Sequence, residues 1–221
     1  MYRLVVLLLA LSAVTMSFVF VTIGKYSTNN GTQDSARIAA FGVRIKASDT
    51  SSFETEYSTD GKTITVKSSS GDKIVAPGTA DKNGIKFSVT GKPEVATELL
   101  ISVTPKNDVF LKTEKNGAEY VYKPVRFALV CGGELLASGT LAELSEKLET
   151  IAITFDAGET LDREISLSWE WSYDSVDENG DVYDTALGDI AANIVPEGME
   201  EGADYSLDVE YEISITVNQI D

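Results

Sequence analysis

Strict alternation of apolar and polar residues near the C-terminus is the feature that most restricts the fold of this chain. The odd positions from 205 to 217 read Tyr205, Leu207, Val209, Tyr211, Ile213, Ile215 and Val217, and each position between them is polar or charged. Successive side chains of a strand point to opposite faces, so this run has one dry face and one wet face. One buried face per strand is typical of antiparallel sandwiches and barrels.

Shorter runs of the same kind recur along the chain. They predict strands near residues 37–47, 53–57, 63–67, 85–89, 99–103, 125–131, 134–138, 151–155 and 161–173. Thr140 and Glu143 form a capping box that predicts a helix to about Glu149, and a second short helix is expected over Thr185–Ile194. We therefore expect an all-β chain, an antiparallel, jelly-roll-like β-sandwich with one or two short inserted helices.

Two local details complete the prediction for the strands. In the first strand, Ala39, Phe41, Val43 and Ile45 are expected to share one inward face. Asn83-Gly84 is expected to stand just before a new strand that begins at Ile85. No linker and no repeat divides residues 37–221, so they are expected to form a single domain.

The N-terminal residues have the composition of a targeting segment. Leu4–Ile23 is apolar and uncharged and follows Arg3, so residues 1–27 are expected to be a signal peptide or an N-terminal anchor. Cleavage is the favoured alternative, and contact with a membrane is expected only through residues 4–23 if the segment is retained. Polar residues 28–36 are expected to form a flexible arm. Either alternative places the folded part outside the cell, secreted or at the cell surface.

Charge and composition exclude several classes of function. The formal net charge is −17, which repels nucleic-acid phosphates. The chain has no histidine, so the usual zinc sites and the usual base of a serine or cysteine triad are missing, and no enzyme activity is expected. Cys131 is the single cysteine. It is either a reactive thiol or, as its place on an apolar strand face favours, a buried small hydrophobe.

Trp169 and Trp171 allow two interpretations. They share a strand face with Ile165, Leu167 and Tyr173. Two tryptophans spaced by two residues can form a platform for a sugar ring, but each can also bury about 150–250 Å² in a core. The continuous apolar register favours the core.

The segment from 174 to 184 is dense in oxygen ligands. The possible calcium ligands are Asp174, Asp177, Asn179, Asp181 and Asp184. Calcium takes six to eight oxygens from such groups, although the glycine and glutamate positions of an EF-hand loop are absent. The alternative is a solvated acidic loop that holds no metal, so calcium is the one possible cofactor and none is certain.

Several short motifs, taken in order, resemble the TasA/camelysin-like secreted proteins of Gram-positive bacteria, whose leader is cut by a dedicated, SipW-type signal peptidase. The motifs are Gly24-Lys25-Tyr26-Ser27 at the end of the leader, the strand Ala39–Ile45, Val75-Ala76-Pro77-Gly78-Thr79, Ile85–Gly91 with Pro93-Glu94-Val95, Ser168-Trp169-Glu170-Trp171, and Asp184-Thr185-Ala186-Leu187-Gly188. Lys25 stands where that family prefers a small or hydroxyl residue.

The resemblance implies a jelly-roll sandwich and a structural role. Known members build extracellular fibres of the biofilm matrix, in which an N-terminal strand of one subunit completes the sheet of the next. The expected function is therefore a self-assembling matrix subunit or accessory that associates through its N-terminal arm. The alternatives are a module that binds carbohydrate or matrix polysaccharide and, more weakly, a camelysin-like metalloprotease. Because the chain has no histidine, no catalytic residue is carried over.

Overall fold

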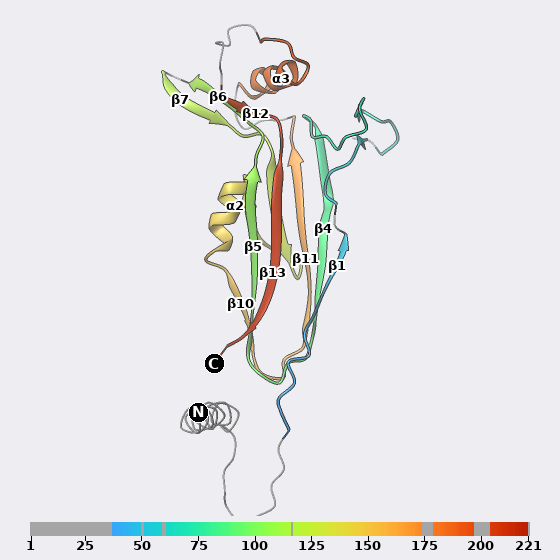
Figure 1. Cartoon of the computed structure of the whole chain (residues 1–221), viewed down its shortest axis with the longest axis vertical. Helices are drawn as coiled ribbons and strands as arrows, with labels where there is room; N and C mark the ends of the chain where they lie inside the picture. Colours follow the sequence, from blue (N-terminus) through green and yellow to red (C-terminus); the bar gives the residue numbers. More distant parts are fainter. Residues whose placement is uncertain are drawn as a thin grey trace, which may run out of the picture. The chain divides into compact units, whose positions relative to one another are not determined.

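The computed structural model describes residues 37–49, 51–58, 61–115, 117–173, 179–196 and 204–220. The fold lies within Ala39–Asp221 and consists mostly of strands in antiparallel sheets that pack together (Figure 1). The predicted all-β, sandwich-like fold is confirmed. The expected leader, residues 1–27, and the expected arm, residues 28–36, lie outside the described residues, so both remain predictions.

The larger sheet has five antiparallel strands. Their spatial order is β1 (Arg44–Asp49), β4 (Thr79–Gly91), β11 (Leu161–Trp171), β8 (Arg126–Cys131) and β9 (Glu134–Gly139). β11 is the middle strand and pairs along most of its length with β4 on one side and β8 on the other. This position makes β11 the most enclosed strand of the sheet.

The second layer is a sheet of three antiparallel strands. Its order is β10 (Ala152–Phe155), β5 (Thr97–Asn107) and β13 (Glu210–Gln219). The two layers meet where the ring of Phe127 on β8 lies 5.6 Å from that of Tyr211 on β13. Smaller sheets join β12 (Tyr205–Ser206), β6 (Phe110–Lys115) and β7 (Ala118–Tyr122), and β2 (Glu56–Tyr57) with β3 (Val66–Lys67).

The core contains the apolar row of β11. Trp169 and Trp171 are only 2 % and 5 % exposed, which confirms that they are core residues rather than a sugar platform. The indole Nε1 of Trp169 donates a hydrogen bond of 2.6 Å to the carbonyl oxygen of Ser52. Cys131 is buried as well, and burial raises the pKa of its thiol, so it behaves as a small hydrophobe.

Two helices interrupt the described strands. Helix α2 (Leu141–Leu148) begins at the predicted capping box: Glu143 N–H donates to Thr140 Oγ1, and Thr140 N–H donates to Glu143 Oε2. Helix α3 (Gly180–Ala191) begins five residues before the predicted Thr185, so the second half of the acidic segment is helical rather than a loop. Within the described ranges, no helix combines the length and apolarity needed to cross a bilayer.

The first predicted strand is wrong at its start and in its burial. β1 begins at Arg44, and Ile45 is 43 % exposed instead of buried. The reason is its place at an edge: β1 pairs with β4 only. The C-terminal run shows the same effect. Its alternation is confirmed, but the inward row of β13 is only half-buried because β13 is also an edge strand.

The expected break at Asn83-Gly84 is a β-bulge inside a continuous β4. Asp81 lies opposite Trp169 and Ile85 opposite Leu167, so the residues between them on β4 outnumber those on β11. Asp81 Oδ1 accepts the N–H groups of Asn83 (3.0 Å) and Gly84 (2.9 Å). Gly84 has φ +58°, and a Cβ there would collide with the carbonyl oxygen of Leu167. The bulge therefore requires glycine at this position.

Substituting Gly84 tests this close approach. Gly158 also has a positive φ, +78°, but a Cβ there would meet no atom within 4 Å. Gly158→Ala should therefore cost only the left-handed backbone, about 1–2 kcal/mol. Gly84→Ala should cost about 1–3 kcal/mol more because the strands must separate. Urea unfolding of both variants measures the difference in the free energy of unfolding. Equal losses would contradict the prediction, because they would show that β11 can move away from residue 84 at no energetic cost.

Candidate functional site

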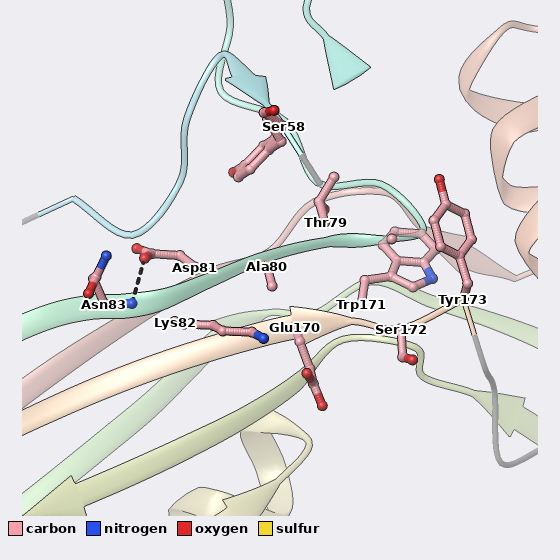
Figure 2. Close-up of a pocket in the computed structure, with 12 residues that line it drawn as sticks. Ser58, Thr79, Ala80, Asp81, Lys82, Asn83, Glu170, Trp171, Ser172 and Tyr173 are labelled. Carbon is pink, nitrogen blue, oxygen red and sulfur yellow. Dashed lines mark hydrogen bonds between the residues drawn. The ribbon is translucent and has the colours of Figure 1, made fainter. Parts of the chain in front are cut away.

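A pocket lies where the ends of β4 and β11 meet the β2–β3 hairpin (Figure 2). Its volume is about 770 Å³, within the range of small-molecule sites. Three segments line it: Tyr57–Ser58, Gly78–Asn83 and Glu170–Tyr173. The pocket is thus built from residues more than a hundred positions apart in the sequence, which no local pattern could bring together.

The pocket follows a bare edge of β4. β1 pairs only with Lys86–Thr90, so among the described strands none pairs with Thr79–Asn83 on the side away from β11. A tight turn fixes the start of this stretch: Thr79 Oγ1 donates to the carbonyl oxygen of Ala76 (2.6 Å) and accepts the Ala76 N–H (3.1 Å). The edge is held by its own turn and by β11.

Tyr173 is the exposed aromatic side chain of the pocket. The sequence placed it on the core face of the strand, but the strand ends at Trp171 and Tyr173 is 60 % exposed. Its ring occupies the space that a Cβ on Gly78 would need, and Gly78 has φ +78°. The N–H of Gly78 donates to the carbonyl oxygen of Trp171 at 2.7 Å, which keeps this contact in place.

Asp184 fixes the indole of the neighbouring Trp171 through a hydrogen bond. The Oδ1 atom of Asp184 accepts hydrogen bonds from Trp171 Nε1 (3.0 Å) and from the Tyr122 hydroxyl (2.8 Å). All three side chains are buried. Burial raises the pKa of the Asp184 carboxyl, against the two hydrogen bonds, which lower it. Asp184 thereby links α3, β7 and the pocket wall.

The possible calcium ligands are separated by this arrangement. Asp174 and Asp177 lie outside the described residues. Asn179 is the N-cap residue of α3 without a side-chain cap, and Asp181 is exposed in the first turn. Asp184 is turned into the core. Among the described residues, no three acidic, histidine or cysteine side chains gather to hold a metal, and the calcium hypothesis stays a prediction.

A second exposed feature is the outer edge of β13. Among the described strands β13 pairs with β5 alone, so one row of its backbone groups faces away from the sheet. Its inward side chains, Tyr211, Ile213, Ile215 and Val217, pack against the core but are only half-buried. An open edge beside half-covered apolar side chains is a place where another strand can add.

The buried carboxyl of Asp184 gives a pH prediction. Its folded pKa is raised above the unfolded value, so the folded state binds more protons between the two values. This group should therefore add stability as the pH falls from 7 toward about 4 and lose it as the pH rises. Asp184→Asn should remove that component, and the exposed Asp162→Asn, whose charge does not act on Asp184, should not. The test is the free energy of unfolding in urea, measured at several pH values. If this free energy changed with pH in the same way for wild type and Asp184→Asn, the prediction would be contradicted.

Comparison with family models, curated proteins and solved structures gives no match to this chain. The resemblance to the TasA/camelysin-like family therefore rests on the short motifs quoted above and stays a prediction.

Proposed function

We propose that the protein is a secreted or cell-surface structural subunit that assembles with copies of itself by strand addition. The observation that carries this proposal is the open edge of β13 beside a half-covered apolar row. Main-chain hydrogen bonds give affinity in such additions, and the alternate side chains fix the register. Export itself rests on the leader-like residues 1–27.

The unequal sizes of the two layers support an added strand on this side. The larger sheet has five strands and the smaller has three. At the β1 edge of the larger sheet, the side chains of Ile45 and Ala47 are exposed, and Phe87 on β4 is only partly buried. A fourth strand beside β13 would extend the smaller layer and cover more of the apolar surface that now meets water.

The donor we propose is residues 28–36 of another copy. This polar segment can supply backbone groups to the edge, and the adjoining Ile38, 92 % exposed, supplies an apolar side chain. The chain after it is tied to its own subunit, because Ala40 N–H donates to Glu94 Oε2 and Glu94 N–H donates to the Ala40 carbonyl, both at 2.9 Å. An arm anchored at Ala40 could thus reach outward without loosening its own fold.

Removal of the arm tests the donor. The exported protein lacking residues 28–36 should keep its melting temperature and circular dichroism but form no filaments in electron microscopy. A synthetic peptide of residues 28–38 should slow assembly of the intact protein by occupying the edge. Thr32→Pro/Gln33→Pro removes two N–H donors at constant length and should also weaken assembly. Unchanged filaments from the deleted protein would disprove the donor.

A matched pair of lysines on β13 tests the acceptor. Ile215 belongs to the half-buried inward row, whereas Thr216 is exposed on the outer face. A lysine at an inward edge position hinders strand addition because its charge would be covered by the incoming strand. Ile215→Lys should therefore abolish filaments while Thr216→Lys retains them, provided that thermal melting shows both variants to be folded. Equal filament yields would place the interface elsewhere.

A further inference from the structure

We propose that the pocket along the bare edge of β4 binds a polysaccharide of neutral or amino-sugar units, with Tyr173 as its stacking residue. This site is distinct from the β13 edge, and it does not depend on strand addition. The sugar platform at Trp169 and Trp171 was the less favoured interpretation of the sequence, and both residues are buried. The ring of Tyr173, two residues after Trp171, is exposed and is the stacking surface that we propose instead.

The ring of Tyr173 is suited to stacking. It is 60 % exposed, and it packs on Gly78, whose missing side chain leaves room for it. Figure 2 shows the ring beside Trp171 at the end of β11. The carbon–hydrogen face of a pyranose is apolar and packs on aromatic rings, while the hydroxyl groups at its rim need polar partners. A ring fixed on one side by its own backbone loses little conformational entropy on binding.

Polar side chains from both β4 and β11 also line the pocket. Asp81, Lys82 and Asn83 on β4 and Glu170 on β11 line the pocket (Figure 2). They supply both donors and acceptors, as sugar hydroxyls require. Two carboxylates against one ammonium give the lining a negative balance, which disfavours uronic acids, phosphates and nucleic acid and favours neutral or cationic sugars.

A peptide strand fits the same edge less well. Strand addition needs a regular row of backbone groups. The bulge at Lys82–Gly84 interrupts that row, since Asp81 Oδ1 already accepts the N–H groups of Asn83 and Gly84. Only Thr79–Asp81 remain regular ahead of the bulge, which is shorter than an ordinary strand.

Calorimetric titration of the exported protein with defined hexasaccharides tests the proposal. The probes are β-1,4-linked hexamers of glucose, N-acetylglucosamine and glucosamine, with a hexamer of galacturonic acid as the anionic probe. At least one neutral or cationic hexamer should bind. Tyr173→Ala should weaken that binding about tenfold, the upper end of what one aromatic contact contributes. Tyr173→Phe, which keeps the ring, should bind within about twofold of wild type.

A second exposed tyrosine provides the matched control. Tyr205, 45 % exposed on β12, is not part of the pocket lining, and Tyr205→Ala should leave binding unchanged. Thermal melting should show that each variant folds. Absence of binding to every neutral and cationic hexamer, equal binding by Tyr173→Ala, or a preference for the anionic hexamer would overturn the proposal. Filament formation by Tyr173→Ala should be normal, so failure of the sugar site and failure of strand addition give different results.

Discussion

Burial of the inward row of β11 is the interaction on which the rest of the structure depends. Ile165, Leu167, Trp169 and Trp171 are all buried, and the strand pairs with β4 and β8 on its two sides. Burying an aliphatic side chain of this size contributes about 1.5–3 kcal/mol, and the indoles bury still more surface. The loop carbonyl of Ser52 and the helix carboxylate of Asp184 then attach to the two indole N–H groups. The segment at Ser52 and helix α3 are thereby both positioned by one strand.

The same strand explains why the pocket lies where it does. β4 keeps its inward residues in phase with β11 on both sides of the bulge, because the bulge adds two residues to β4 and an even number leaves the alternation of faces unchanged. β1 stops at the level of Lys86, before the bulge, so the far half of β4 has no outer neighbour among the described strands. The open part of the β4 edge therefore lies beside the end of β11, and the exposed Tyr173 comes two residues after that end.

The sequence predicts those helices and strands that are determined by residues close together in the chain. The capping box at Thr140 and Glu143 marks the start of α2 correctly, and the alternation around Trp169 marks the buried face of β11. Alternation cannot tell a central strand from an edge strand, which is why Ile45 and Ile215 are less buried than expected. Asn179 at the N-cap and Asp181 in the first turn are local signals for the start of α3, whereas the contacts of Tyr183 and Asp184 with distant Tyr122 leave no local pattern. The pocket escapes prediction for the same reason, except that an apolar register running past the strand end could have pointed to Tyr173.

The buried thiol of Cys131 reports how often the sheet opens. Its thiol lies at the pairing of β8 with the central β11, opposite Ile165, where reagents cannot reach it while the sheets stay closed. Alkylation of this single thiol must therefore wait for β8 to separate from its neighbours, and its rate follows the free energy of that separation. A subunit held more firmly by its neighbours would open less often, so the labelling rate of one natural atom would distinguish free from assembled molecules without any added probe.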